Sequence, residues 1–347
     1  MLNYNISLSS FNSFGIDTYA RRFFRYNQLD QLQNFIKDVN QHNQDLVVFG
    51  GGSNILLTEP LDPVVIHPVN KHIHITDSGN DKVTISADAG VVWDDLVSFS
   101  LDHNLYGIEN LSMIPGNCGA APIQNIGAYG AELSEVFLKL EAVDLHTGEI
   151  HKFTGQDCEF GYRDSIFKTV AKGKFCINRI YITLEKNGSL NLNYGSIRET
   201  LETMEISSPT PTDVSNAVRR IRGSKLPDPQ KLGNAGSFFK NPIVRKPQYE
   251  NLLSQWPDMP GYSLSDERKK IPAGWLIDRA GWKGYRHGNA AVHERQALVL
   301  VNLGGSSGRE ILELAETIRR DIDNRFGILL EPEVNIWNRQ ARQIALA

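Results

Sequence analysis

The stretch MIPGNCGAAPIQNIGAYGAE, residues Met113–Glu132, decides how the rest of this chain is interpreted. Its glycines and alanines keep the side chains small, so backbone N–H groups can approach a ligand closely. Pro115 and Pro122 stiffen the segment, and the amides of Gln124 and Asn125 can pair with the edge of a heterocycle. Loops this long in compact domains tend to be functional. We therefore expect a ligand cradle here, with an irregular, tightly packed loop as the alternative.

A second glycine-rich segment, Gly50–Asn54, reads GGGSN and follows an apolar run at residues 46–49 that predicts a short strand. It does not match the dinucleotide fingerprint GxGxxG, because no helix is expected after it, and it lacks the GK[ST] end of a P-loop. A nest of backbone N–H groups beside a serine hydroxyl can still hold a pyrophosphate. A hairpin turn is the alternative.

The composition bounds the class of protein. The chain of 347 residues has room for two or three domains, and its net charge of −4 argues against general binding to nucleic acid or to an anionic membrane. The cysteines at positions 118, 158 and 176 form no CxxC pair, so neither a disulfide framework nor a metal site is indicated. No signal-peptide pattern and no apolar run of membrane-spanning length is visible. We therefore expect a cytoplasmic protein.

Hydrophobic periodicity divides the chain into two parts. Up to about residue 190, amphipathic helices and alternating strands predict an α+β region with much antiparallel sheet. The helices are expected at 28–43 and 91–104, and the strands at 55–57, 72–75, 82–86, 137–145, 149–153 and 175–184.

The second part follows a polar junction at residues 185–211 and is expected to be α/β. Its helices are expected from Thr212 or Asp213 to Ser224, at 273–280 and at 308–326, and its strands at 297–302 and 328–334. The end of the first of these helices is basic, with Arg219, Arg220, Arg222 and then Lys225. Such a cluster suits a diphosphate, and a solvated helix face is the alternative.

Three short segments combine reactive side chains with glycine or proline. GYRDS at 161–165 presents an arginine that could bind a carboxylate with two hydrogen bonds. GNAGSFFKNP at 233–242 presents a serine between glycine and two aromatic residues, and LEPEV at 330–334 places Glu333 in an apolar strand, where a buried carboxyl could stay protonated. A surface ion pair, a serine turn and an edge-strand glutamate are the respective alternatives.

Two other patterns favour ordinary explanations. His72 and His74 share one face of an expected strand and could pair on a metal, but with no third ligand nearby solvated histidines are favoured. GGSSG at 304–308 matches GxSxG, yet a hydrolase of that type needs a histidine later in the chain, and the last histidine is His293.

Taken together, these segments resemble the UDP-N-acetylenolpyruvoylglucosamine reductase family of flavoenzymes, and the resemblance spans nearly the whole chain. The matching motifs follow the family's order, at residues 14–16, 50–54, 114–116, 122–130, 161–167, 225–229, 234–242, 273–278 and 330–334. Asn289 departs from the pattern, which has glycine at this position of a turn.

The resemblance implies both a fold and a reaction. The fold is α+β, with an FAD-binding fold of the vanillyl-alcohol-oxidase / p-cresol methylhydroxylase type at 1–190 (subdomains at about 1–66 and 67–190) and a C-terminal α/β substrate-binding domain at 191–347. The reaction is the NADPH-dependent reduction of UDP-N-acetylglucosamine enolpyruvate to UDP-N-acetylmuramate through non-covalent FAD, in peptidoglycan precursor synthesis. The implied partners are the UDP-sugar and NADPH, with no nucleic acid and no membrane, and a monomer is expected.

The resemblance also carries over site residues. The catalytic roles fall on Arg163, Ser237 and Glu333. Because a serine hydroxyl is a weak acid, we expect a neighbouring cation, Lys225 or Lys240, to assist proton transfer. The residues implied in FAD binding are Gly50, Gly51, Gly52, Ser53, Asn54, Pro115, Gly116, Ile123, Gln124, Asn125, Gly127 and Tyr129. Those implied in substrate binding are Tyr162, Tyr194, Lys225, Asn241 and Gln296. Tyr194 lies in LNYG at 192–195, which resembles the tyrosine-bearing loop of one subclass.

Two other functions stay open on the sequence alone. A flavin oxidase of the same fold often holds its flavin covalently through histidine or cysteine, and Cys118 is the single such residue in the two glycine-rich stretches. A non-catalytic nucleotide-sugar-binding protein would not need Arg163, Ser237 and Glu333 together, and all three are present.

Overall fold

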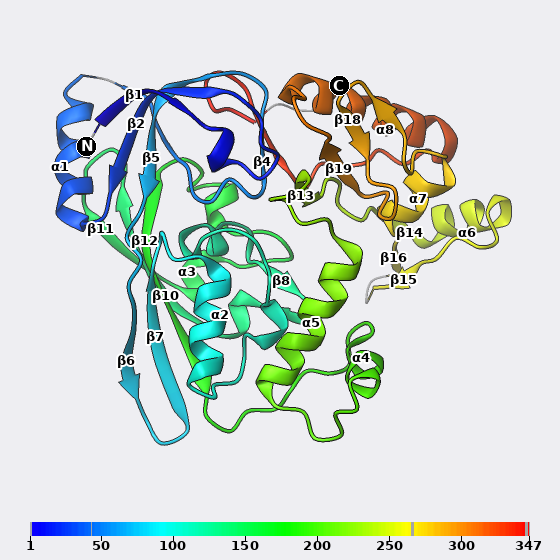
Figure 1. The fold of residues 1–347 in the computed structure, drawn as a ribbon, viewed down its shortest axis with the longest axis horizontal. Helices are drawn as coiled ribbons and strands as arrows, with labels where there is room; N and C mark the ends of the chain where they lie inside the picture. The colour runs from blue at the N-terminus through cyan, green and yellow to red at the C-terminus, as the bar shows by residue number, and fades with distance from the viewer. Residues whose placement is uncertain (1, 43, 265–266, 344–345, 347) are drawn as a thin grey trace. The chain divides into compact units, whose positions relative to one another are not determined.

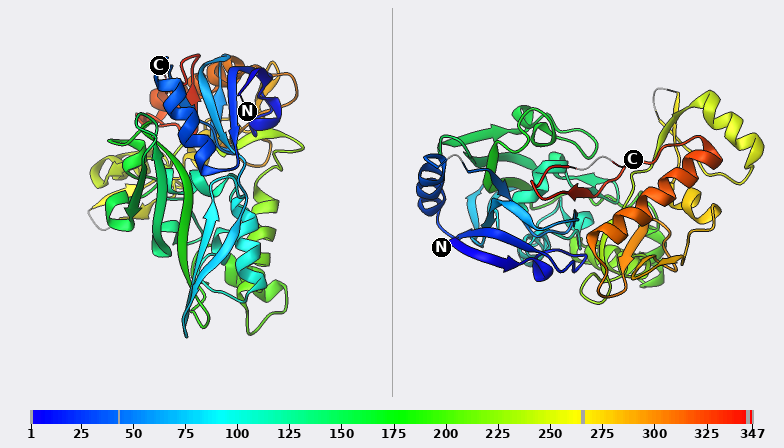
Figure 2. Two further views of the ribbon diagram at one scale, coloured as in Figure 1. Left: turned by 90° about the vertical axis from the view of Figure 1, so that its left-hand side faces the viewer. Right: turned by 90° about the horizontal axis from the view of Figure 1, so that it is seen from above.

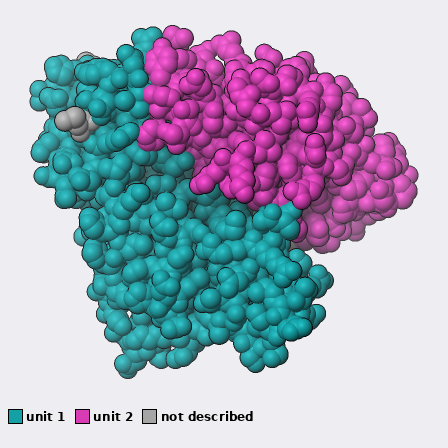
Figure 3. All heavy atoms as spheres, viewed as in Figure 1, with its two compact units in different colours: residues 1–6, 20–51, 63–224 teal, residues 7–19, 52–62, 225–347 magenta. Residues whose placement is uncertain are grey.

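The computed structural model describes residues 2–42, 44–264, 267–343 and 346. The chain forms two compact units, coloured in Figure 3: residues 1–6, 20–51 and 63–224 make the first, and residues 7–19, 52–62 and 225–347 make the second. These limits differ from the predicted ranges, because residues 191–224 belong to the first unit and two N-terminal segments belong to the second. The division into cofactor and substrate domains stays a prediction.

One sheet of the first unit has the strand order β1–β2–β5–β3. Its strands run at Leu2–Ser7, Tyr19–Tyr26, Leu61–Pro68 and Leu46–Val48, respectively. Helix α1 (Leu29–Asn40) lies beside this sheet (Figure 1), because Leu32 and Ile36 on its apolar stripe pack into one core with Val64 and Ile66 of β5. The helix expected at 28–43 is therefore confirmed.

The larger sheet of the first unit has the order β11–β10–β12–β7–β6, and its neighbouring strands are antiparallel. In that order the strands are Ile150–Thr154, Phe137–Asp144, Phe175–Glu185, Lys82–Asp88 and Ile73–Ser78. Strands β6 and β7 form a long hairpin (Figure 1). Helix α2 (Trp93–Asp102) buries Trp93, Leu96 and Val97 in the core that this sheet lines. The expected antiparallel sheet and the helix within 91–104 are confirmed.

The described part of the first unit also contains α3 (Gly155–Cys158), α4 (Ile197–Thr203) and α5 (Pro211–Lys225, whose last residue belongs to the second unit). The expected caps Thr212 and Asp213 are wrong for α5. Thr210 Oγ1 accepts the Asp213 N–H at 3.3 Å, and Asp213 Oδ2 accepts the Thr210 N–H at 2.9 Å. This reciprocal pair caps the helix one residue before Pro211, and proline is well suited to the first helical position.

The second unit contains a sheet with the order β13–β19–β18–β17, whose pairs are antiparallel. Its strands are Gly233–Ser237, Val299–Asn302, Ala290–Val292 and Arg286–His287. The long helix α8 (Gly308–Phe326; orange in Figure 2) and helix α7 (Ala273–Arg279) share one core with this sheet. Gly288 takes φ = +59° at the β17–β18 turn, so the turn forms with Asn289 in place of the family's glycine.

The remaining strands of the second unit are short. β14 (Ile243–Arg245), β16 (Arg268–Lys270) and β15 (Tyr262–Ser263) form a small sheet beside α6 (Lys246–Gln255), and β4 (Ile55–Leu57) pairs in parallel with β20 (Asn335–Trp337). The strand expected at 328–334 is wrong, since regular pairing begins at Asn335. Pro332 makes an isolated bridge to Phe239, and proline cannot donate to a strand ladder.

Short 3₁₀ helices and two-residue strands occupy several connections. The 3₁₀ helices are η1 (Ser9–Phe11), η2 (Glu109–Leu111), η3 (Cys118–Gln124), η4 (Leu133–Glu135) and η5 (Ile166–Lys168). Strands β8 (Gly127–Ala128) and β9 (Ala131–Glu132) form a small hairpin at the end of the central glycine-rich stretch, Met113–Glu132.

Candidate functional site

The central glycine-rich stretch is held against the chain that enters α2. Cys118 and Gly119 donate their N–H groups to the carbonyls of Val91 at 2.8 Å and Ala89 at 3.0 Å. A Cβ atom on Gly119 would lie 2.6 Å from the Ala89 Cβ, so glycine permits this close approach. The loop therefore has a defined backbone shape.

Gly50 and Gly51 of the second glycine-rich segment lie against the first segment within unit 1. A Cβ on Gly51 would lie 2.4 Å from Asn117 Oδ1 and 3.2 Å from Gly116 Cα, and one on Gly50 would be 3.6 Å from the Ala120 Cβ. Two predicted cradle segments, distant in sequence, are thus brought together. Their lack of side-chain bulk fits a cofactor that carries a pyrophosphate.

Gly52, Ser53 and Asn54 belong to the second unit. Gly52 has φ = +59°, and its carbonyl accepts the Ser13 N–H at 3.1 Å. The Ser13 hydroxyl oxygen is buried without a hydrogen-bond partner among the described residues, as expected of a group that a ligand could satisfy. Asn54 donates from Nδ2 to the Glu333 carbonyl at 3.2 Å.

The Asn125 side chain forms hydrogen bonds within the protein, whereas the sequence pattern predicted a contact with a heterocycle. Asn125 is buried with φ = +42°, and its Nδ2 donates to Glu132 Oε2 at 2.8 Å and to the Gly161 carbonyl at 3.1 Å. Its Oδ1 accepts the Ser134 N–H at 3.0 Å. The amide therefore joins the glycine-rich stretch to the turn that carries Arg163.

Of the other expected cradle residues, Pro115 is exposed, whereas Gly116, Ile123 and Gln124 are half-buried.

Arg163 and Tyr162 form the tip of a tight turn. Gly161 and Asp164 exchange backbone hydrogen bonds of 3.0 and 3.2 Å, and Arg163 has φ = +55°. Its Nη2 donates to the Gly127 carbonyl, and its Cζ lies 5.6 Å from the centre of the Tyr162 ring. The guanidinium is thereby fixed at the edge of the glycine-rich stretch, beside an exposed tyrosine.

Tyr129 and Tyr194 lie together in the first unit. Tyr129 and Gly130 have φ values of +50° and +80° at the two-residue β8–β9 turn, as a type I′ turn requires. The Tyr129 and Tyr194 ring centres are 6.5 Å apart at 90°. Asn191 donates to the Gly130 carbonyl at 2.8 Å, so the segment of Tyr194 is tied to this turn.

Arg222 joins this cluster, although no site role was expected of it by itself. It is half-buried, and burial lowers the pKa of its guanidinium while the neighbouring Tyr129 and Asp94 oppose that shift. An arginine still keeps its charge. Arg219, one turn earlier, is engaged with both oxygens of Asp94 at 2.6 and 2.8 Å. The sequence shows that the end of α5 is basic. It does not show that Arg219 pairs with Asp94 whereas Arg222 lies near Tyr129.

Ser237 and Glu333 lie on neighbouring backbone segments of the second unit. Ser237 ends β13 and directly follows Gly236, which has φ = +70°. The next residue, Phe238, accepts the Glu333 N–H at 2.8 Å through its carbonyl. Glu333 is half-buried and precedes β20, so its expected place inside a strand is wrong.

The other residues expected to bind substrate in this unit have defined surroundings. Asn241 Oδ1 accepts the Ala273 N–H at 2.9 Å at the start of α7. The Gln296 N–H donates to His293 Nδ1 at 3.2 Å. Lys240 Nζ is 3.2 Å from Glu331 Oε2, and Lys225 is exposed at the end of α5.

Comparison with known proteins covers almost the whole chain. Residues 228–337 match the C-terminal domain of UDP-N-acetylenolpyruvoylglucosamine reductase, and residues 20–154 match an FAD binding domain. The reductase of Flavobacterium johnsoniae is 45% identical over 333 residues, which cover 96% of this chain and 98% of the relative. The reductase of Pseudomonas aeruginosa is 46% identical over 336 residues, which cover 97% and 99%.

The chain belongs to the UDP-N-acetylenolpyruvoylglucosamine reductase family. The crystal structure of the reductase (MurB) from Thermus caldophilus has the same fold, with a TM-score of 0.69 at 22% identity over 97% of this chain and 100% of that one. The family resemblance and the combined fold class predicted from the sequence are therefore confirmed.

The structure explains the His72/His74 pair and the GGSSG segment at 304–308 without a metal-binding or hydrolase role. His72 Nδ1 is bonded to the Asp88 carboxylate at 2.9 Å, and no group of three or more metal-ligating side chains occurs within the described residues. In GGSSG, Ser306 is buried, and Ser307 forms a reciprocal cap with Glu310 at the start of α8. Across the described part of the chain, no helix is long and apolar enough to cross a membrane.

Proposed function

We propose that this chain reduces UDP-N-acetylglucosamine enolpyruvate to UDP-N-acetylmuramate, a step of peptidoglycan precursor synthesis. NADPH is the electron donor and FAD the bound cofactor. The observation that carries this proposal is the identity of 45% to the Flavobacterium reductase over 96% of the chain. The overall change adds a hydride and a proton across the enolpyruvyl double bond, and NADPH becomes NADP⁺.

The FAD pyrophosphate and ring would be held by the glycine-rich segments. The residues we assign to this role are Gly50, Gly51, Gly52, Ser53, Asn54, Pro115, Gly116, Ile123, Gln124, Gly127 and Tyr129. The Asn125 side chain would stabilise the loop through its hydrogen bonds to Glu132 and Gly161. Backbone N–H groups suit the phosphates because they bring partial positive charge without side-chain bulk. When bound, FAD supplies to the terminal vinyl carbon of the substrate the hydride received from NADPH.

Arg163 would stabilise negative charge on the substrate carboxylate. Hydride addition at the vinyl carbon leaves electron density on the neighbouring carbon and its carboxylate, and a fixed guanidinium is suited to this charge. The bond from Arg163 to the Gly127 carbonyl supports this role, because it orients the side chain before substrate arrives. We assign Glu333 to the same catalytic group, and its backbone is held by the Asn54 side chain and the Phe238 carbonyl.

Ser237 would deliver the proton to the carbon that bears the ether oxygen. A serine hydroxyl is a weak acid, so a neighbouring cation is needed to favour the transfer. Lys240 already faces the Glu331 carboxylate, whereas Lys225 is exposed at the end of α5. Lys225 is therefore our preferred assistant, and Lys240 the alternative.

The UDP-sugar itself would contact Tyr162, Tyr194, Lys225, Asn241 and Gln296. The exposure of Tyr162 and Tyr194 supports a contact with a bound ligand, since both rings present large apolar surfaces and a hydroxyl to solvent. The Asn241 oxygen is occupied at the start of α7, so we assign its contact to the Nδ2 donor.

The Ser237→Ala variant tests the proposed division of labour. It should keep reduction of bound FAD by NADPH and lose reoxidation by the enolpyruvyl substrate, with a fall of at least about 10²-fold in the second rate, the lower range for a general acid. Anaerobic stopped-flow absorbance follows the two half-reactions separately. Ser254→Ala, at an exposed position of α6, is the control and should retain both.

Two results would contradict these roles. If the Ser237→Ala protein is reoxidised by substrate at the wild-type rate, Ser237 is not the proton donor. If both half-reactions fail while FAD remains bound, Ser237 is needed for the structure of the site, and the specific role in proton transfer is wrong.

We also propose a cytoplasmic location and a monomer. Three buried free cysteines suit a reducing compartment. Sedimentation equilibrium measures the mass in solution, and a dimer there would contradict the proposed monomer.

A further inference from the structure

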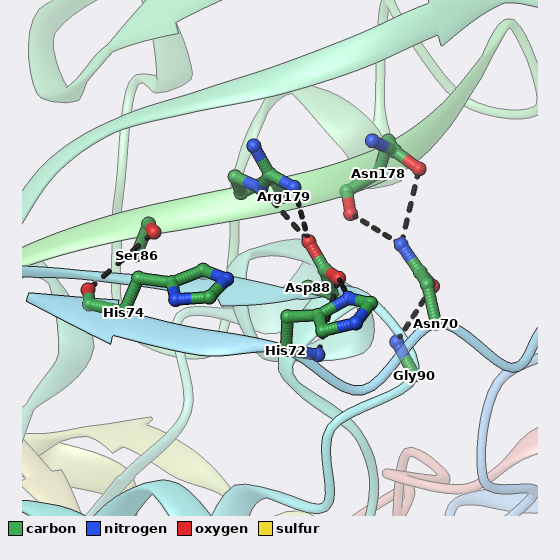
Figure 4. Close-up of polar contacts among 8 residues, drawn as sticks. All are labelled: Asn70, His72, His74, Ser86, Asp88, Gly90, Asn178 and Arg179. Carbon is green, nitrogen blue, oxygen red and sulfur yellow. Dashed lines mark hydrogen bonds and ion pairs between the residues drawn. The ribbon is translucent and has the colours of Figure 1, made fainter. Parts of the chain in front are cut away.

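A polar network at the end of β7 lies beside the chain that supports the glycine-rich stretch (Figure 4). Asp88, the last residue of β7, has a side chain that is 2% exposed, and polar contacts from Arg179 and His72 converge on it. Arg179 donates to Oδ1 from Nε at 2.8 Å and from Nη2 at 2.7 Å. His72 reaches Oδ2 from its backbone N–H at 3.1 Å and from Nδ1 at 2.9 Å.

A second layer of the network fixes the next turn of the chain. Buried Asn70 donates from Nδ2 to the Asn178 carbonyl and to Asn178 Oδ1, both at 3.3 Å. Its Oδ1 accepts the Gly90 N–H at 3.3 Å. A Cβ on Gly90 would lie 2.5 Å from the Asn70 carbonyl oxygen, so the two backbones are in close contact.

The residues directly after Asp88 hold the glycine-rich stretch. The carbonyls of Ala89, Gly90 and Val91 accept, in turn, the Gly119 N–H at 3.0 Å, Asn117 Nδ2 at 3.0 Å and the Cys118 N–H at 2.8 Å. Three successive carbonyls thus set the position of three successive loop residues. The Asp88 network lies directly before the first of these carbonyls.

We infer that Asp88, with Arg179 and His72, is a positioning residue for FAD affinity. The buried carboxylate anchors the start of residues 89–91, and those carbonyls hold the loop at 117–119 in the shape that receives the cofactor. Preorganisation lowers the conformational cost of binding, so loss of the anchor weakens FAD binding in addition to weakening the sheet. The inference rests on the proposed FAD-dependent function.

The network is not arranged as a metal site. His72 and His74 stack with ring centres 5.8 Å apart and an angle of 10° between the rings. His72 is already committed through Nδ1 to Asp88, and the positive Arg179 shares the same carboxylate. The carboxylate charge is therefore balanced within the protein.

Asp88→Asn is the main test. The amide replaces one acceptor oxygen with a donor facing Arg179 or His72, which leaves a buried donor without a partner. Equilibrium dialysis of flavin-free protein against FAD should show a dissociation constant raised by about tenfold, equivalent to 1.4 kcal/mol. Gly119→Ala, whose methyl would meet Ala89 directly, should raise it at least as much.

Thr84→Val is the matched control. It removes a side-chain contact, Thr84 Oγ1 to Thr183 Oγ1 at 3.3 Å, between the same strands β7 and β12 but away from the loop. This variant should have a lower unfolding temperature than wild type, because one sheet contact is lost. Its dissociation constant for FAD should stay within about twofold of the wild-type value. Arg179→Lys should retain more FAD affinity than Arg179→Gln, because the lysine keeps the charge beside Asp88.

The outcomes are distinguishable. If Asp88→Asn and Arg179→Gln lose thermal stability but bind FAD as wild type does, the network only stabilises the sheet and the inference is wrong. His72→Ala, at a largely exposed side chain, gives a folded second variant and should weaken FAD binding by about threefold, the value of one hydrogen bond. If the wild-type protein takes up no FAD, the proposed function itself fails.

Discussion

At the scale of single residues, the sequence suggests candidate side chains but not what they contact. Arg163, Ser237 and Glu333 are candidates from their short motifs and the family resemblance, and their catalytic roles stay a prediction. The left-handed backbone of Arg163 and its bond to Gly127 could not be predicted. The first depends on a turn closed by Gly161 and Asp164, and the second joins residues 36 positions apart in the chain. Asn125 was expected to face a ligand and instead binds Glu132 and a carbonyl, since spacing alone cannot say which partner reaches a buried amide first.

The three cysteine thiols yield a prediction at this scale. Cys118, Cys158 and Cys176 are buried and free. Burial raises the pKa of Cys158 and of Cys176 to about 12, and it raises that of Cys118 as well. Because the thiolate is the reactive form, an aromatic disulfide reagent at about pH 8 should label none of them in the native protein and all three in denaturant.

The same shifts set the sign of a pH effect. Each thiol has a higher pKa folded than unfolded, so its contribution to stability is complete below the unfolded value of about 8.5 and is lost as pH rises above it. Denaturant midpoints should therefore fall from about pH 8 to pH 10. In the labelling experiment, rapid reaction of the native protein at about pH 8 would contradict the burial of the three thiols.

At the scale of elements, periodicity located the longer helices and strands and missed the short ones. The expected range 308–326 is the range of α8, because its apolar stripe spans 19 residues and its ends carry a serine cap and Gly327 at φ = +62°. Helix α4 was missed because seven residues with buried Ile197 and Leu201 are too few to show a period. The strand expected at 328–334 failed at Pro332, whose missing N–H limits pairing.

The start of α8 can be tested by one substitution. Ser307 Oγ accepts the Glu310 N–H at 3.2 Å, and Glu310 Oε2 accepts the Ser307 N–H at 2.7 Å. Ser307→Ala should lower the free energy of unfolding by about 1 kcal/mol, the usual value of such a cap. Urea unfolding measures this loss, and Thr317→Ala at an exposed position inside α8 is the control. Equal stabilities for Ser307→Ala and wild type would show that the cap contributes nothing.

At the scale of the whole molecule, the family and the combined fold were predictable, whereas the assignment of segments to units was not. Nine motifs in order identified the family before any contact was known. The placement of residues 7–19 and 52–62 in the second unit depends on packing between segments distant in sequence. Phe14, Ile16 and Leu56, for example, lie in the core of helices α7 and α8. Periodicity marks these residues as apolar but does not indicate which core receives them.

The central claim is that this chain transfers reducing equivalents from NADPH through FAD to an enolpyruvyl UDP-sugar. The most direct test is an anaerobic visible spectrum of the purified protein, with NADPH and then UDP-N-acetylglucosamine enolpyruvate added in one cuvette. We predict a yellow protein whose flavin band bleaches with NADPH and returns with the sugar, together with UDP-N-acetylmuramate as the product. A colourless protein that takes up no added FAD, or a bleached band that the sugar does not restore, would contradict the claim.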